Sequence, residues 1–433
     1  MISKESKQLL KSLKLLKSSV HSSIYKDIQK YLSKHKTPLN ILFQLIQENY
    51  CNILPNVKYI EQKLSDSQKI NIHSKLKDII FLSDKDREHI LQQLPILNKI
   101  EATYKSDKIV LHISSKKKLK SQTLQRILTK LFLLIDLFTE KRNTTFDLYI
   151  WLSDLKKQKP MQNKTEEHTH EHTHEHTQSH MSKKKFRAEH INSGATVHNL
   201  LEESVELFIW RKEEIEKVLL HEMIHTLKLD FMQYPEELKQ DFIREFNIPS
   251  TITLRLGETY VESWAIILNT IFVSFLHSNS GVDIKVIRKI KPKVLYEFLT
   301  MEIYFTLFQC VKILSHFGYQ CMEHCKVPFI NKQNDDIFQQ ETSVFSYYLI
   351  KAGVLMNLGE FFQYCCNWNE RLLQIKEEPI NFQELHKVFI NSAKQNILLD
   401  KMFSVHEKQK NKKNQKEPTL ENTMRMTLYE QTL

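Results

Sequence analysis

Two histidines and a glutamate stand at a spacing that suits metal chemistry, in the string HEMIH at positions 221–225. Residues four apart lie on one face of a helix, so the imidazoles of His221 and His225 can converge on one Zn²⁺ ion. Glu222, beside the first histidine, is placed to take a proton from an attacking water. The surrounding residues, from Val218 to Leu227, are mostly apolar, which predicts a buried helix. Two surface histidines on an amphipathic helix, the alternative, fit this setting poorly, since burying such groups without a metal is costly.

A catalytic zinc site also needs a third protein ligand and an open position for water. The segment RLGETYVESWAIILN, residues 255–269, carries Glu258 and Glu262 four residues apart among apolar neighbours, which predicts a second buried helix. One carboxylate can bind zinc while the other accepts the N–H of a histidine and fixes its tautomer. The spacing alone leaves open which of the two glutamates is the ligand.

Composition excludes several classes of enzyme. A chain of 433 residues with average glycine content would hold about 30 glycines, and this one holds 6. A kinase, a P-loop enzyme and a Rossmann dehydrogenase are therefore excluded, and long helices are expected. The formal net charge of +11 is spread along the chain without arginine-rich, aromatic-interleaved patches, so no specific nucleic-acid partner is expected.

No segment is expected to span a membrane or to act as a signal peptide. The apolar stretch 264–277 is short, and the stretch 294–314 carries charged residues in or beside it. The N-terminal residues contain no unbroken apolar core of signal-peptide length. We therefore expect an intracellular protein that is not secreted.

The elements that must hold these residues follow from the hydrophobic pattern. Strands are predicted at 108–114 and 146–153, with an apolar helix at 121–138 between them, which is typical of a layered α/β unit. Two further strands, 191–197 and 205–210, lead into the helix that starts at about 211. The expected organisation is a helical N-terminal region over 1–98, a catalytic domain over 99–290, a helical C-terminal subdomain over 291–400 and a disordered basic tail over 401–433.

A histidine-rich loop interrupts the catalytic domain at about 154–185. Its tract EEHTHEHTHEHTQSH holds six histidines, from His168 to His180, and has no apolar periodicity, so it is expected to be disordered. Two interpretations of this loop remain open: it is a repeat expansion without function, or it helps to load metal into the protein.

The motif HEMIH followed by ETYVE resembles the gluzincin zinc metallopeptidases, which pair HExxH with a helix carrying ExxxD or ExxxE. ETYVESW is most similar to the EFFAEAF-type helix of anthrax-lethal-factor-like proteases, which implies that Glu258 is the ligand and Glu262 supports a histidine. In thermolysin-like and aminopeptidase branches Ala or Ser follows the ligand by three residues, so Ala265 would favour Glu262; we prefer Glu258. A metzincin needs Gly and a third His soon after His225, and TLKLDFMQYPE has neither.

The resemblance covers about residues 145–360 and extends, more loosely, to uncharacterised metallopeptidases of giant DNA viruses. It implies a zincin-like upper lobe whose edge strand, 191–197, pairs with an extended substrate. It also implies a location in the host cytoplasm or the virion. Spacing places no residue that binds the oxyanion, so Tyr347 and Tyr348 in SVFSYYLIKAG are candidates.

We therefore expect an α+β protein that hydrolyses peptide bonds of a protein or peptide substrate. Zn²⁺ would be held by His221, His225 and Glu258, with Glu222 as general base. A catalytically silent, zinc-stabilised structural or virion-associated protein is the alternative. The intact Glu222 argues against it, because a purely structural site needs no base.

Overall fold

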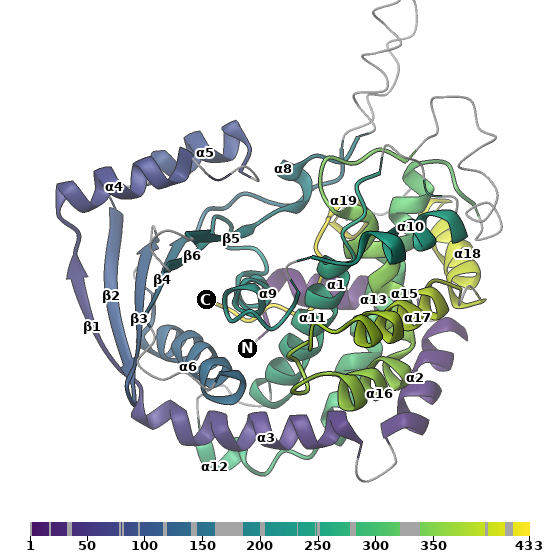
Figure 1. The fold of residues 1–433 in the computed structure, drawn as a ribbon, viewed down its shortest axis with the longest axis horizontal. Helices are drawn as coiled ribbons and strands as arrows, with labels where there is room; N and C mark the ends of the chain where they lie inside the picture. The colour runs from purple at the N-terminus through teal and green to yellow at the C-terminus, as the bar shows by residue number, and fades with distance from the viewer. Residues whose placement is uncertain are drawn as a thin grey trace, which may run out of the picture.

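A computed structural model gives the fold of the chain (Figure 1). It describes residues 2–433 apart from 17–18, 33–36, 78, 80–81, 94–95, 116–118, 140–144, 161–184, 200–203, 232, 247, 249–251, 278–282, 321–337, 395–396 and 412–418. The six histidines of 168–180 lie outside the described residues. The fold is α+β, as expected: a mixed sheet is flanked in sequence by mostly helical N- and C-terminal regions.

The described residues form a six-stranded sheet in the order β1-β2-β3-β4-β6-β5. Strands β3, β4 and β6 are parallel to one another, and β1, β2 and β5 are antiparallel to their neighbours. The bounds are β1 Lys58–Lys63, β2 Leu97–Tyr104, β3 Asp107–Ser114, β4 Thr145–Trp151, β5 Gly194–Asn199 and β6 Ser204–Ile209. Strand β5 is an edge strand, with its second side free of strand pairing in the described part of the chain.

Both faces of the sheet are covered, and side chains alternate between them. In β4, Phe146, Leu148 and Ile150 join the larger core, with helix α6 (Ser121–Phe138). Tyr149 and Trp151 point to the opposite face, into a smaller core under α4 (Asp66–Lys77) and α5 (Asp84–Leu91). Helix α6 links β3 to β4, because two parallel strands need a long crossover connection, which is usually a helix.

Two helices carry the residues singled out in the sequence. Helix α9 (Ile215–Thr226) packs against β5 and β6 on one side and against α11 (Leu256–Leu276) on the other. Figure 1 shows α9 between the sheet and the helical part of the molecule. The two glutamates therefore approach the histidines from the helical side.

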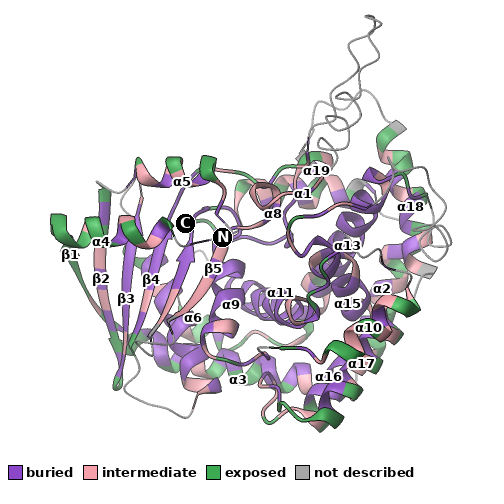
Figure 2. Ribbon diagram, turned by 45° about the horizontal axis from the view of Figure 1, so that its top comes forward, coloured by how far each residue is buried: buried purple, intermediate pink, exposed green. Residues whose placement is uncertain are grey.

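The helical part is built around α11 and α13 (Lys293–His316), which Figure 2 shows as mostly buried. By length and composition alone both helices could cross a membrane, yet α11 is completely and α13 almost completely buried inside the protein. Burial accounts for their apolar sequences without a bilayer. The remaining helices are α1 Lys4–Leu15, α2 Ser19–Leu32, α3 Pro38–Ile53, η1 Leu54–Asn56, α8 Ala188–Ile191, α10 Glu236–Glu245, α12 Ile284–Ile287, η4 Phe345–Ile350, α15 Lys351–Met356, α16 Leu358–Trp368, α17 Pro379–Lys394, α18 Ile397–Asn411 and α19 Thr419–Asn422.

At the ends of the chain one expectation is refined and another is corrected. The N-terminal region 1–98 contains strand β1 and the start of β2, so it contributes to the sheet and is not purely helical. The tail 401–433 is not disordered where it is described: α18 runs to Asn411, and all residues from 424 to 431 are buried. The physical reason is that buried carboxylates bind its backbone, since Glu214 accepts from the N–H of Met426 and of Thr427.

Candidate metal centre

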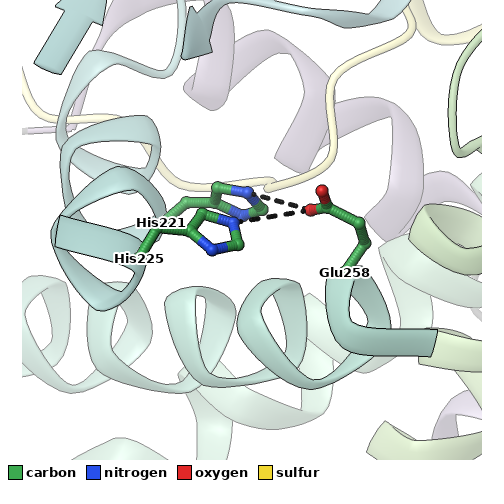
Figure 3. Close-up of side chains that lie close together, drawn as sticks. All are labelled: His221, His225 and Glu258. Carbon is green, nitrogen blue, oxygen red and sulfur yellow. Dashed lines mark ion pairs between the residues drawn. The ribbon is translucent and has the colours of Figure 1, made fainter. Parts of the chain in front are cut away.

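The side chains of His221, His225 and Glu258 converge between α9 and α11, as Figure 3 shows. The carboxylate oxygen Oε2 of Glu258 lies 3.3 Å from Nε2 of His221 and 3.7 Å from Nε2 of His225. All three potential ligand atoms lie within 4.8 Å of one another. The expectation that these residues come together is confirmed, and they form a group that could hold a metal ion.

The spacing and chemistry of this group fit zinc. Two ligand atoms bound to one tetrahedral zinc at 2.0–2.1 Å lie about 3.3 Å apart, which is close to the two nitrogen–oxygen distances at Glu258. Two imidazole nitrogens and one carboxylate oxygen are also a usual protein ligand set for a zinc ion that keeps one open position.

Each histidine is oriented by a carboxylate on its other ring nitrogen. Nδ1 of His221 lies 2.9 Å from Oε2 of Glu262, and Nδ1 of His225 lies 2.7 Å from Oδ2 of Asp230. A carboxylate at Nδ1 keeps the ring proton on that nitrogen, which leaves the lone pair of Nε2 free to bind a metal. Glu262 thus lies behind His221, on the side away from Glu258.

Asp230 was not anticipated from the sequence, because its position depends on how α9 ends. Lys228 adopts a left-handed backbone with φ 53°. Its N–H donates to the carbonyl oxygen of His225, and the N–H of Leu229 donates to the carbonyl oxygen of Ile224. These two bonds form a Schellman motif, which turns the chain sharply at a helix end. The turn brings Asp230 back against His225. The sequence signal was weak, since Lys and not Gly occupies the left-handed position.

Glu262 is held ionised by two buried lysines. Oε1 and Oε2 of Glu262 lie 2.9 and 3.0 Å from Nζ of Lys217. Oε1 also lies 3.7 Å from Nζ of Lys351. Burial would raise the pKa of Glu262, but Lys217, His221 and Lys351 outweigh burial and lower it far below its usual range. The carboxylate therefore stays charged at neutral pH and can accept from His221.

The protonation equilibria within the ligand group are mutually coupled. Burial lowers the pKa of His221 and of His225, but their carboxylate partners outweigh burial and raise both pKa values. Burial likewise opposes ionisation of Glu258, yet the two histidines bring its pKa well below the usual range. The two histidines and Glu258 thus favour one another's charged forms.

Glu222 faces the same cavity and does not join the ligand group. Its Oε2 accepts a hydrogen bond of 2.9 Å from the hydroxyl of Thr196 in β5. Burial raises the pKa of Glu222 above its ordinary value, against the influence of His221 and His225. Strand β5 comes close here because residue 194 is glycine: a Cβ atom at Gly194 would lie 2.7 Å from Oε1 of Glu222.

Of the two candidate tyrosines, one lies at the cavity and the other does not. Tyr347, in the π-helix η4, lines the cavity, and its hydroxyl donates to Oε2 of Glu258 over 3.0 Å. Tyr348 is buried elsewhere, and its hydroxyl donates to the carbonyl of Met424. Burial raises the pKa of Tyr347 well above its usual value, with the charge of Glu258 adding to the effect, so the phenol keeps its proton. Single-turn π-helices occur frequently at functional sites.

The cavity at the metal group measures about 250 Å³ and continues into a second cavity of about 610 Å³. Residues shared by the two are His198, His225, Arg255 and Glu258. His198, in β5, was not anticipated from the sequence. Burial and the nearby cations lower its pKa, so it is neutral near pH 7.

Comparison of the chain with protein-family models, with curated proteins and with solved structures found no match. The resemblance to gluzincins therefore rests on the HEMIH helix and on the arrangement of His221, His225 and Glu258.

Proposed function

We propose that the protein is a zinc-dependent metallopeptidase. The observation that carries the proposal is that His221, His225 and Glu258 converge while Glu222, in the same cavity, is left out of the group. When bound, zinc would act as a Lewis acid on the scissile carbonyl and would acidify a water molecule.

Glu222 acts as the general base in this proposal. Its carboxylate takes the proton of the attacking water and then gives it to the leaving amine. A pKa raised by burial suits both tasks, because a base works best when its pKa lies near the working pH. The hydroxyl of Thr196 fixes the direction of the carboxylate through the bond to Oε2.

Tyr347 is the candidate for stabilising the oxyanion. Its protonated hydroxyl lies beside Glu258 at the edge of the cavity, where it can donate to an oxygen that gains negative charge. Tyr348 has no such access, since its hydroxyl is engaged by the backbone of Met424.

The substrate in this proposal is an extended segment within a polypeptide. Gly194, Ala195, Thr196 and His198 of the edge strand β5 line the cavity, and an edge strand can pair with an extended peptide through its backbone. The two adjoining cavities offer room on both sides of the metal group. This arrangement favours cleavage inside a chain over removal of single terminal residues.

A catalytically silent structural or virion-associated protein remains the rival proposal. It predicts the same metal and the same fold, without turnover. Glu222 and its bond from Thr196 speak against it, because a structural metal site has no use for an oriented carboxylate outside the ligand group.

The experiment that separates the two compares wild type with Glu222→Gln on a pool of denatured proteome peptides, with zinc measured in the same samples. The amide is nearly isosteric but cannot accept the proton, so zinc should be kept and cleavage should fall by roughly 10²–10⁴-fold. Equal cleavage by both proteins above a metal-free blank would exclude the role of Glu222. Absence of cleavage by both would favour the silent rival.

A further inference from the structure

One end of the cavity at the metal group is lined by buried lysines. Lys157 and Lys217 are 2% and 3% exposed, and both line the cavity together with Ser193 and Met426. We call these four residues the lysine end. Lys157 belongs to the segment that follows β4, and Lys217 lies one helical turn before His221 in α9. Charged side chains this deeply buried are rare unless they have partners or a ligand.

The lysine end is tied to the metal group by a chain of polar contacts. Nζ of Lys157 lies 2.8 Å from Oε2 of Glu214, and Oε1 of Glu214 accepts from the N–H of Met426. The sulfur of Met426 lies 3.6 Å from Nζ of Lys217, which in turn bonds Glu262. The position of these cations is thus fixed by packing before any substrate binds.

Buried lysines and buried carboxylates meet at this end of the cavity in the described part of the chain. Glu262 is paired with Lys217 and Lys351, Glu214 is paired with Lys157, and Glu222 also acts on Lys217. The ammonium group of Lys157 has three N–H donors, and its bond to Glu214 uses one of them. An acceptor oxygen that reaches Lys157 would gain a charge-assisted hydrogen bond, which is strong where water is excluded.

The pKa of Lys157 agrees with this incomplete pairing. Burial lowers the pKa of Lys157 despite the nearby Glu214, so the carboxylate only partly offsets the burial of the ammonium group. Glu302, a neighbouring buried carboxyl group, has a pKa raised by burial to about 7 and is only partly charged at neutral pH.

The lysine end also offers a donor without an acceptor. The hydroxyl of Ser193 is buried and has no hydrogen-bond partner among the described residues. Asn192, also in the cavity wall, accepts from the hydroxyl of Thr342 through its amide oxygen. An occupant with acceptor oxygens would satisfy the hydroxyl of Ser193, and an apolar one would not.

The direction of the substrate follows from strand β5. A peptide that pairs antiparallel to β5 runs from the His198 end toward the Gly194 end. Gly194 adjoins Val218, beside the lysine end, whereas His198 adjoins His225 and the second cavity. The residue that reaches the lysine end is therefore on the C-terminal side of the bond to be cleaved.

We propose that the lysine end selects a substrate with an aspartate or glutamate directly after the scissile bond, its carboxylate accepting from Lys157 and Ser193. This inference rests on the proposed peptidase function. It assigns a preference for acidic side chains to a part of the cavity that the hydrolytic chemistry itself does not use.

The test uses end-blocked nine-residue Ala/Gly peptides that carry one central Glu, Gln, Leu or Lys. Wild type should cleave the Glu peptide on the N-terminal side of its Glu, with a kcat/KM at least about tenfold above that for the Leu and Lys peptides. Lys157→Met should remove this preference. The matched control is Lys156→Met, because Lys156 is the adjacent residue, pairs with Glu5 and does not line the cavity; it should keep the preference.

A second variant guards against misfolding of Lys157→Met. Ser193→Ala leaves every ion pair intact and should lower the preference for Glu by a few-fold, the contribution of one hydrogen bond. Zinc content is measured for each variant, since a misfolded site would lose its metal. Equal cleavage of the Glu and Leu peptides by wild type, or an unchanged preference in Lys157→Met, would overturn the inference.

Binding separates this inference from the proposed function. In zinc-loaded Glu222→Gln protein, fluorescence anisotropy should show the Glu peptide binding at least about tenfold more tightly than the Leu peptide, and Lys157→Met in that background should abolish the difference. If no peptide is cleaved but this selectivity is seen, the peptidase function fails, while the preference of the lysine end for an acidic side chain stands. If binding shows no selectivity, the inference fails whether or not peptides are cleaved.

Discussion

Oδ2 of Asp230 lies 2.7 Å from Nδ1 of His225, five residues earlier in the chain. Because this carboxylate engages the nitrogen away from Glu258, it determines which ring nitrogen of His225 is free for a metal. Glu262 does the same for His221 from α11. The two histidines are thus oriented by carboxylates that come from different elements.

The first prediction concerns Asp230→Asn. The amide keeps the size of the side chain but loses its charge, so zinc affinity should fall by about 10–100-fold with little change in fold. Competition with a chelator of known affinity measures the loss. Asp241→Asn, in a surface ion pair with Arg244, is the matched control and should bind zinc like wild type. An unchanged affinity in Asp230→Asn would remove Asp230 from the site.

The second prediction separates Glu258 from Glu262. Glu258→Gln should cost far more zinc affinity, because it removes the carboxylate that lies nearest to both Nε2 atoms. Glu262→Gln should cost more stability, by about 3–5 kcal/mol, because Lys217 and Lys351 lose their buried partner. Chelator competition and denaturant unfolding report the two effects. If Glu262→Gln loses more zinc and Glu258→Gln more stability, the two roles must be exchanged.

The third prediction uses the close approach of β5 to α9. A Cβ atom at position 194 would lie 2.7 Å from Oε1 of Glu222 and 2.8 Å from Cγ1 of Val218. Gly194→Ala should therefore displace Glu222 and suppress cleavage while zinc is retained. Gly359→Ala, whose added Cβ would be 3.5 Å from its nearest neighbour in Tyr31, serves as control. Full activity in Gly194→Ala would contradict the placement of Glu222.

The fourth prediction is a pH dependence of stability that arises from Glu302. Burial raises the pKa of this carboxyl from 4.5 to about 7, so the folded state binds its proton more tightly than the unfolded state does. Its contribution to stability is complete below pH 4.5 and is lost as pH rises through about 7. The loss amounts to roughly 3 kcal/mol.

Denaturant unfolding of wild type and Glu302→Gln across this range isolates the effect. The free energy of unfolding should fall with pH in wild type relative to the variant, since the amide cannot titrate. Parallel pH profiles for the two proteins would show that Glu302 is charged throughout.

The sequence predicted the elements whose pattern is local. The HEMIH helix, helix α6 and strands β3 and β4 follow from apolar periodicity, and the convergence of His221 and His225 follows from the four-residue spacing. Strand β1 was missed because its sequence KYIEQK is largely exposed and lacks an apolar alternation. Nothing local marks it as part of the sheet.

The residues that were missed at the site depend on contacts between distant segments. The approach of His198 to His225 requires β5 to lie beside α9, which spacing along the chain does not reveal. The C-terminal residues look polar and solvent-exposed in sequence, yet Glu302 accepts from the N–H of Leu428 and fixes that segment inside the protein. Partners more than a hundred residues apart carry no sequence signal of their own.

The central claim is that one metal ion is held by His221, His225 and Glu258, and metal stoichiometry tests it most directly. Zinc per chain should be measured by elemental analysis after dialysis, in protein whose six histidines from 168 to 180 have been replaced by serine to remove weak binding. We predict one zinc per chain in this protein and none once His221→Ala and His225→Ala are added. One tightly bound zinc in the protein that lacks both His221 and His225 would contradict the account.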